Sequence, residues 1–557
     1  NQLHAKVGGN HKNIGYFIEY LNYGSDGFKT LESGKNTGFN KNDVVAKLRV
    51  QLFPNQAVKQ TLDFKFQYAD EMGNETYLGL TEADFKTNPF SRYAASNNDK
   101  MTTDHTQYML THHLGFSKNL TLTTTFYRNN FARNWYKLND ITFEDDKQKI
   151  SKILEDPTGY SNHFNIVNGT ANSAADAIGV KANNRAYYAQ GIQTKLDYHW
   201  YTGNAFHDLE MGFRYHYDEE DRFQWVDKYS ISNTGVLTET TAGIPGTDAN
   251  RISSAKAFAS YITYKLKYQN WTFTPGVRYE DILLERKDFG KSDITRSGSD
   301  LNERENNVAI FIPGMGANYK FNNDFSLFGG IHKGFSPPGN KEDEKAEESI
   351  NYELGTRFNL GKLKGEFVGF YNDYSNLLGS DIAATGGTGS LDQFNAGAVK
   401  VNGIELLLNY NITSKNARFS FPFSFGYTFT NTEFLNSFGS ADSLWGTVMV
   451  GDELPYIPKH QLNAALSLEH AKFEVNLNAR YNGAFRTLAG SGNIPTNEKV
   501  ASNFIIDMSS KYRVTPQFQL TANITNLLNN TYAVSRVPAG LRPGHPFGIY
   551  GGFQYQF

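Results

Sequence analysis

The sequence predicts an all-β fold, a single transmembrane antiparallel β-barrel, and three observations lead to this prediction. First, 14% of the 557 residues are aromatic, yet only 39% are hydrophobic and the mean hydropathy is −0.52. Second, apolar and polar side chains alternate with a period of two residues, as in strands with two different faces. Third, short and long connections alternate between the strand candidates, which is typical of a membrane barrel.

The composition also excludes several classes of protein. A membrane-spanning helix needs about 20 consecutive apolar residues, and the sequence contains no such window. Disordered chains are poor in aromatic residues and carry a high net charge, whereas this chain has 42 Phe, 33 Tyr and a formal charge of −3. With 54 basic against 57 acidic residues, nothing favours nucleic acid as a partner. The absence of cysteine removes disulfides and thiolate chemistry.

Alternation is clearest in the C-terminal third of the chain. In residues 472–481 the apolar face consists of Phe473, Val475, Leu477, Ala479 and Tyr481, and Lys, Glu, Asn and Arg side chains occupy the other face. The same pattern recurs in residues 518–525 and 547–557. A soluble sandwich strand also alternates, so the connections between the strands decide the architecture.

About 21 strand candidates are joined by ten short and ten long connections. The short turns are expected near residues 9–12, 53–55, 117–119, 202–204, 269–270, 322–324, 361–362, 413–416, 470–471 and 515–517. The long connections are expected near residues 30–39, 70–104, 139–182, 233–253, 287–306, 337–347, 379–395, 435–455, 489–499 and 535–540. This regular difference predicts an up-and-down meander with its turns on the periplasmic side. A propeller would show a repeat of about 40 to 50 residues, and the sequence has none.

The order of the connections bears on the number of strands. Because the first connection is short, the first strand, residues 2–9, begins on the side of the long loops, and the last strand, residues 543–557, runs inward. Bacterial barrels of one chain usually have an even number of strands. We therefore expect about 21 strands of a barrel of 22, a size associated with a plugged lumen. Residues 1–557 are then a single barrel domain without the first strand and without the plug, and no signal peptide precedes Asn1.

Several short motifs indicate a family. They read Gly-Phe-Ser-Pro-Pro-Gly at residues 334–339, Glu-Glu-Ser-Ile-Asn-Tyr-Glu-Leu-Gly-Thr-Arg at 347–357, Phe-Tyr-Asn-Asp-Tyr-Ser-Asn-Leu-Leu at 370–378, Val-Asn-Gly-Ile-Glu at 401–405, Asn-Leu-Leu-Asn-Asn-Thr-Tyr at 526–532 and Arg-Pro-Gly-His-Pro at 542–546. In this order and spacing the chain resembles TonB-dependent outer-membrane receptors. Residues 379–389 are similar to the ferric dicitrate receptor branch, and residues 13–27 are similar to the third barrel strand of that branch.

The resemblance implies a location in the outer membrane of a Gram-negative bacterium and uptake of a ferric chelate, with ferric citrate as the first candidate. It implies contact with the lipid bilayer and lipopolysaccharide, and coupling to the TonB complex through an N-terminal part that these residues do not include. The chelate would be cargo, so no cofactor is expected. The alternative is a structural barrel that serves as a partner in a larger outer-membrane assembly, without transport of its own. A passive porin is disfavoured by the size and the motifs, and no catalytic constellation predicts an enzyme.

An anionic chelate calls for arginine, because the guanidinium group binds carboxylates in a bidentate fork and stays charged. Arg133, Arg185 and Arg251 lie at positions similar to those of the ligand arginines in the ferric dicitrate branch, and Arg222 and Arg128 are less well placed alternatives. Asp381 matches a position where that branch has an amide contact, and an aspartate there would repel a citrate carboxylate. The last loop, residues 535–540, lacks an asparagine that would match the second amide contact. Another chelate therefore remains an alternative.

Metal and haem sites find less support. His112 and His113 are neighbours on a predicted strand, so they point to opposite faces and do not form a metal pair. Residues 334–353 lack the loop histidine that haem receptors of this family carry. The acidic stretch at residues 342–348 offers oxygen ligands for Ca²⁺, but it has no calcium-loop spacing, and a solvated loop is the favoured interpretation.

Overall fold

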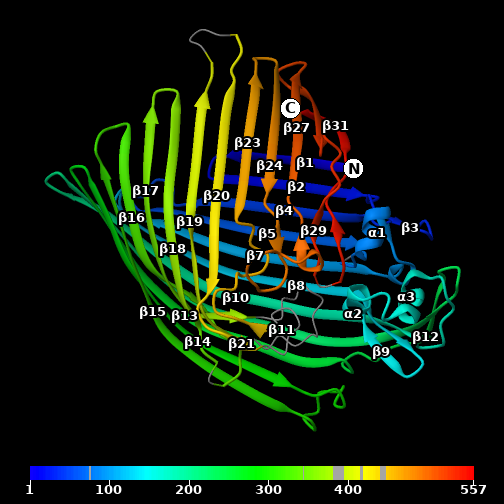
Figure 1. Cartoon of the computed structure of the whole chain (residues 1–557). Helices are drawn as coiled ribbons and strands as arrows, with labels where there is room; N and C mark the ends of the chain where they lie inside the picture. Colours follow the sequence, from blue (N-terminus) through cyan, green and yellow to red (C-terminus); the bar gives the residue numbers. More distant parts are fainter. Residues whose placement is uncertain (75–76, 343, 380–393, 414–417, 440–446, 538) are drawn as a thin grey trace.

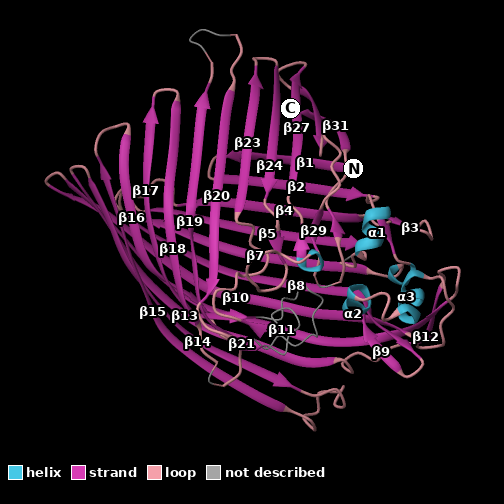
Figure 2. Cartoon of the chain, viewed as in Figure 1, coloured by secondary structure: helices cyan, strands magenta, loops and turns pink. Residues whose placement is uncertain are grey.

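A computed structural model describes residues 1–74, 77–342, 344–379, 394–413, 418–439, 447–537 and 539–557 (Figure 1). Its main feature is a 23-stranded sheet in which neighbouring strands pair antiparallel. Figure 2 shows that strands make up most of the molecule and that its few helices gather at one end. The prediction of an all-β antiparallel fold is confirmed.

The strands of the sheet follow one another in a meander. The N-terminal half contains β1 (Gln2–His11), β2 (Ile14–Ser25), β4 (Phe39–Leu52), β5 (Lys59–Gly73), β7 (Lys100–Gly115), β8 (Leu120–Phe143), β9 (Asp146–Lys149), β10 (Ile178–Thr202), β11 (Ala205–Ile231), β12 (Leu237–Thr241), β13 (Ala249–Tyr268) and β14 (Trp271–Asp288). The C-terminal half contains β15 (Asn302–Lys320), β16 (Phe325–Ser336), β17 (Glu347–Leu360), β18 (Leu363–Gly379), β19 (Phe394–Asn411), β20 (Pro422–Phe434), β23 (His460–Glu469), β24 (Phe473–Asn482), β27 (Asn503–Arg513), β28 (Phe518–Thr525) and β31 (Gly548–Tyr555).

Short and long connections alternate as the sequence predicts. The turn between β10 and β11 has only Gly203 and Asn204, and Gly203 has φ of +58°, a conformation that glycine adopts without steric cost. β9 and β12 are short strands that pair beside the long-connection ends of β8 and β11. Setting these two aside leaves 21 strands that run from one end of the sheet to the other. The end with the long connections is called the outer end below.

The sheet has two edges, formed by β1 and β31, and these two strands run in the same direction. Among the described residues, β1 pairs only with β2 and β31 pairs only with β28. Both edge strands run from the outer end toward the short turns, so they are parallel to each other. Contacts between outer connections link the two ends of the chain: Gly79 donates a backbone hydrogen bond to the carbonyl of Ala539 (2.7 Å), and Arg536 pairs with Glu82 (2.6 Å).

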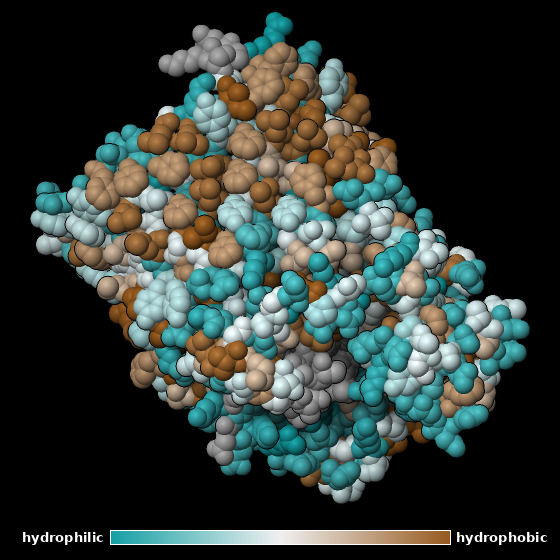
Figure 3. Space-filling view, viewed as in Figure 1, coloured by the Kyte–Doolittle hydropathy of each residue, from teal (hydrophilic) through white to brown (hydrophobic). Residues whose placement is uncertain are grey.

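The two surfaces of the sheet differ in polarity. On β11 the exposed apolar side chains Met211, Phe213 and Tyr215 lie on one face, and Glu210, Arg214 and His216 alternate with them on the other. Figure 3 shows apolar side chains gathered toward the short-turn ends of the C-terminal strands, while the outer end is polar. This arrangement fits a barrel with an apolar outer band and a polar lumen. The face with the exposed apolar side chains is called the outward face, and the opposite one the inward face.

The long connections contain structure that alternation does not predict. They hold α1 (Glu82–Thr87), α2 (Ile150–Glu155), α3 (Ser161–Asn168) and two 3₁₀ turns, η1 (Ala94–Ser96) and η3 (Thr496–Glu498). Four small strand pairs also form there: β3 (Thr30–Leu31) with β6 (Ser91–Arg92), β21 (Phe438–Gly439) with β22 (Thr447–Val448), β25 (Phe485–Arg486) with β26 (Lys499–Val500), and β29 (Ala533–Ser535) with β30 (Arg542–Pro543). No helix among the described residues is long and apolar enough to cross a membrane.

These helices pack into an outer cap with a hydrophobic core of its own. Leu80, Ile153 and Val167 are almost completely buried there against the outer ends of β8, β10 and β11. The ammonium group of Lys137 lies over the rings of Tyr77 and Trp135, at 3.9 and 4.7 Å from their centroids. A cation placed over aromatic faces is attracted by the ring quadrupole, so these two rings stabilise the buried ammonium group of Lys137.

The last strand is shorter than predicted. The sequence predicts it from residue 543, whereas β31 begins at Gly548 and Arg542–Pro543 instead pair with Ala533–Ser535 in a small hairpin. Pro543 and Pro546 have fixed φ and no amide hydrogen, so they cannot join the ladder as ordinary strand residues. The strand therefore begins only after the second proline.

Candidate functional site

Four arginines form a row across four neighbouring strands near the outer end. Arg133 on β8 is the register partner of Arg185 on β10, Arg185 is the partner of Arg222 on β11, and Arg222 is the partner of Arg251 on β13. Side chains at such positions share a face, with Cβ atoms about 4.5–5.5 Å apart. Because Arg222 lies on the face of Arg214 and opposite to Phe213, the row points inward.

Three of the four arginines in the row are buried, and Arg133 is partly buried. Arg222 is fully buried, and Arg185 and Arg251 are each 8% exposed. Arg286 on β14 is also 8% exposed and donates to Asp288 (2.7 Å), the register partner of Arg251. Four guanidinium groups in register repel one another, and burial makes the repulsion stronger because the local dielectric is low.

One carboxylate lies between the two central arginines. Glu220 accepts a hydrogen bond from Arg185 Nη1 (2.9 Å) and one from Arg222 Nε (2.9 Å). The hydroxyl of Tyr187 accepts from Arg133 Nε and from Arg185 Nη1, both at 3.3 Å. Glu220 and Tyr187 thus hold three neighbouring guanidinium groups in place.

The arginine row lies near the outer end of the strands, beyond the length that would cross a bilayer. A tilted strand needs about 9–11 residues to cross a bilayer, and Arg222 lies well beyond that distance from the short turn at Gly203. Burial lowers the pKa of Arg222 to about 9, an effect that Glu220 opposes and that Arg185 and Arg251 reinforce. Burial opposes ionisation of Glu220, but Arg222 and Arg185 outweigh it, so the pKa of Glu220 lies below its ordinary value. At neutral pH Glu220 and Arg222 are therefore both charged.

The row also contains an unused donor. In the part of the chain that the structure describes, Nε of Arg185 is buried and has no hydrogen-bond partner. A buried donor without a partner costs free energy. An anion placed beside Arg185 would supply the acceptor that the protein does not.

Of the residues that the sequence singles out, the structure brings Arg133, Arg185 and Arg251 together. It places Arg133 and Arg185 within strands, because β8 and β10 continue for several residues toward the cap, whereas Arg251 is the third residue of β13. Arg222, which the sequence offers as a less well placed alternative, lies between Arg185 and Arg251 in the row. Asp381 lies outside the described residues.

Arg128 belongs to a different surface. It lies five residues before Arg133 on the same strand and therefore points outward, where it donates to Gln190 (2.8 Å) and its guanidinium group covers the ring of Tyr188. Sequence reasoning missed Glu220, Tyr187 and Arg286. One signal was available: residues 185 and 222 are equally far from the turn at Gly203, so a regular hairpin places them opposite each other.

Below the row, the inward face remains polar. Tyr127 accepts a hydrogen bond from Arg214 Nε (3.0 Å) and is hydrogen-bonded to Nδ1 of His216 (2.6 Å), and Nε2 of His216 lies 3.0 Å from Asp218. These groups satisfy one another and do not form a metal site. The described residues contain no cluster of three or more His, Asp and Glu side chains that would hold a metal ion.

The fold and the site together define a class: a large antiparallel sheet of the β-barrel type with a polar inward face and a row of arginines near its outer end. The TonB dependent receptor-like, beta-barrel family model matches residues 19–527. The chain therefore belongs to the TonB-dependent receptor β-barrel family, as the motifs predict. This is a family of receptors and not of enzymes, in agreement with the sequence.

Relatives and solved structures agree with this membership. The chain is 24% identical over 329 residues to the ferrienterobactin receptor of Escherichia coli strain K12, a match that covers 54% of this chain and 40% of that receptor. The ferric citrate transporter FecA in its unliganded form has 18% identity, with a TM-score of 0.72 over 99% of this chain and 75% of that one. The siderophore receptor PiuA of Acinetobacter baumannii has 14% identity and a TM-score of 0.73 over 100% of this chain and 79% of that one. At such identities the solved structures establish the fold alone.

Proposed function

We propose that the protein is the barrel of an outer-membrane, TonB-dependent importer that binds an anionic ferric chelate, with ferric citrate as the first candidate substrate. The observation that carries the proposal is the row of Arg133, Arg185, Arg222 and Arg251 on the inward face. A ferric carboxylate complex presents several anionic oxygens at once, and a row of guanidinium groups matches such a surface through charge-assisted hydrogen bonds.

The arginine row has the properties of a site prepared for an anion. Glu220 holds Arg185 and Arg222 in place, and Tyr187 holds Arg133. Among the described residues Nε of Arg185 has no acceptor, so an anion beside it gains an attraction that bulk water would screen. The names of two similar proteins, a ferric citrate transporter and a ferrienterobactin receptor, place ferric chelates among the substrates of this family.

We propose a plug and one additional strand as the remaining parts of the working receptor. The two free edges, β1 and β31, run in the same direction, so one strand antiparallel to both would complete the sheet. A barrel of about 22 strands encloses a wide lumen that plugs fill in other transporters. Energy would then come from the TonB complex acting on the plug, and lipid and lipopolysaccharide would surround the barrel.

Chelate binding by the full-length receptor tests the substrate. We expect ferric citrate to bind, and Arg133→Gln and Arg222→Gln each to weaken binding by about tenfold to a hundredfold, as the loss of a charge-assisted hydrogen bond implies. Arg128→Gln is the matched control, because this arginine lies on the outward face of β8. Equal affinities for all variants would remove the arginine row from the site. Absence of binding to any ferric carboxylate, with the barrel correctly folded, would refute the substrate class.

A further inference from the structure

The barrel wall has a gap where β15 and β16 pair over only part of their length. β15 pairs with β14 along residues 302–319, but it pairs with β16 only from Gly314 to Lys320. In the part of the chain that the structure describes, residues 302–313 have no strand on their second side. The division begins at Pro313, which has no amide hydrogen and therefore ends a ladder. β16 continues to Ser336 beside β17 and away from β15.

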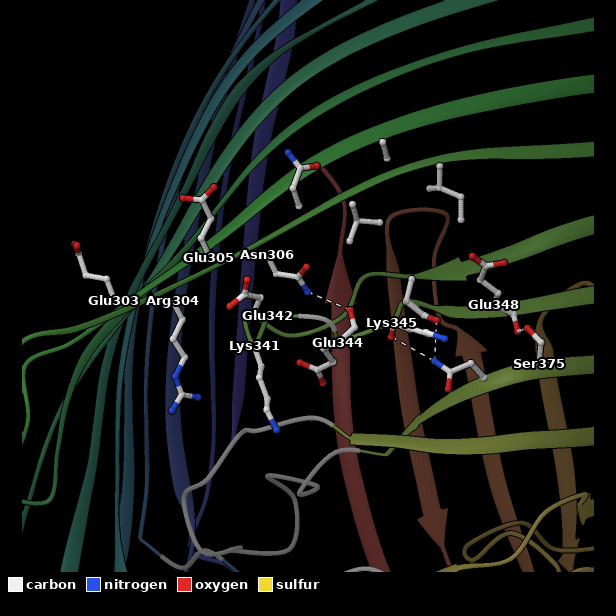
Figure 4. A pocket seen from close by; sticks show the side chains of 16 residues that line it. Glu303, Arg304, Glu305, Asn306, Lys341, Glu342, Glu344, Lys345, Glu348 and Ser375 are labelled. Carbon is white, nitrogen blue, oxygen red and sulfur yellow. Dashed lines mark hydrogen bonds between the residues drawn. The ribbon is translucent and has the colours of Figure 1, made fainter.

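A cleft of about 1560 Å³ occupies the division (Figure 4). Residues of both faces of β15 line it, including Glu305 on the outward side and Asn306 on the inward side. The amide group of Asn306 donates to the carbonyl oxygens of Gly339 (3.0 Å) and Glu344 (3.1 Å), which holds the connection between β16 and β17 against the inward side. The cleft is therefore bounded by an open strand edge on one side and a loop on the other.

The cleft lies above the apolar band. Phe311, which is 64% exposed, packs against Tyr279 of β14 and belongs to the outward apolar surface. From Phe311 the strand continues through Asn307 to Glu305 and Glu303, so the lining becomes charged toward the outer end. The acyl chain of a lipid carries no group that would pair with these charges or hydrogen-bond to the backbone amides of the edge. The chemistry fits another polypeptide backbone, because only a backbone repeats donors and acceptors at the spacing of a strand edge.

Charges on the two paired strands specify the occupant further. Glu305 lies directly opposite Glu285 on the outward face, and Glu285 is paired with Lys256 on its other side (2.7 Å). A strand on the open side would place a cation next to Glu305 and so offset the repulsion between the two glutamates. Deeper in the cleft its inward neighbours would be Val308 and Ile310, the latter only 7% exposed, which favour apolar side chains.

We propose that this edge binds an extended segment of a partner protein, which pairs antiparallel with residues 303–312. The segment carries apolar side chains at alternate positions and a basic residue near its C-terminal end, opposite Glu305. Binding occurs outside the membrane and does not require the arginine row. The site is thus an interaction surface separate from the arginine row.

The protein contains no cysteine, so Asn307→Cys gives a single attachment point on the open edge. The probe is a synthetic peptide of about ten residues with the pattern described above and a photoreactive or thiol-reactive group at its centre, added to the receptor in lipid nanodiscs. We expect saturable cross-linking to Asn307→Cys. Gln190→Cys is the matched control, because Gln190 points outward from a strand that is paired on both edges, and it should give none.

Two further comparisons decide whether backbone pairing is responsible. Methylation of alternate peptide amides on the edge that faces β15 should weaken binding by about tenfold or more, since several backbone hydrogen bonds of about 1 kcal/mol each are lost. The Glu305→Lys variant should bind the original peptide more weakly. A second peptide, in which glutamate replaces the basic residue, should bind this variant with the original affinity. Equal binding of the methylated peptide, no cross-link at all, or a receptor dimer linked through Asn307→Cys without peptide would each overturn the proposal.

Discussion

Arg185 and Arg222 lie directly opposite each other on β10 and β11, and both donate a hydrogen bond to the single carboxylate of Glu220 at 2.9 Å. This anion lies between two buried cations in register and reduces their repulsion. Nε of Arg185 has no acceptor among the described residues. The relationship therefore connects the local stability of the outer strands with the affinity for an anion, and the predictions below separate the two effects.

The first prediction concerns the shared carboxylate. Glu220→Gln leaves two buried guanidinium groups without their anion, which costs about 3 kcal/mol by analogy with broken buried ion pairs. We expect faster amide hydrogen exchange at the outer ends of β10 and β11, and tighter binding of an anionic chelate that takes over the role of the carboxylate. Glu219→Gln is the control, because Glu219 is the neighbouring residue on the outward face. Unchanged exchange in Glu220→Gln would contradict the assignment.

The second prediction concerns pH. The pKa of Glu220 is lower in the folded protein than its ordinary value, with burial opposing ionisation and Arg222 and Arg185 outweighing it. The folded state therefore holds the proton less tightly than the unfolded state. The stabilisation is complete above the ordinary glutamate pKa of about 4.3 and is lost as the pH falls through the lower folded value. Hydrogen exchange at the outer end of β11 should rise in this acidic window in the native protein and stay flat there in Glu220→Gln.

The third prediction concerns the outer cap. Ile153 of α2 is fully buried in the core of the cap, so Ile153→Ala creates a cavity that costs about 2–5 kcal/mol. We expect faster proteolysis of residues 144–177 without a change in the barrel strands. Lys152→Ala, at an exposed position of the same helix, should leave the cleavage rate unchanged. Equal rates in the two variants would mean that the cap does not depend on this core.

The fourth prediction concerns the free edges. If one further strand lies between β1 and β31, the amides on those edges should exchange slowly in a full-length receptor and rapidly in the chain of residues 1–557. Amides of β10, which is paired on both edges, provide the internal reference. Rapid exchange at β1 and β31 in the full-length receptor would exclude a closing strand.

Much of the architecture follows from local sequence. Alternation assigns Phe213 to the outward face and Arg222 to the inward one because side chains on a strand point to opposite sides in turn. Two-residue turns such as Gly203–Asn204 mark the inner end, and polar insertions mark the outer end. The cap helices were not predicted, because Ile153 and Leu80 become core residues only after distant loops meet.

The class of fold, the direction of each strand and the family follow from the amino-acid sequence, since these depend on short-range patterns repeated along the chain. Which arginines meet depends on the tertiary structure. Arg133 and Arg185 are separated by a long connection whose length does not set the register of β8 and β10, so the alignment depends on the pairing of whole strands. The open edge that begins at Pro313 also could not be predicted from the sequence. A proline limits strand pairing, but the path of the neighbouring strand determines whether a cleft forms.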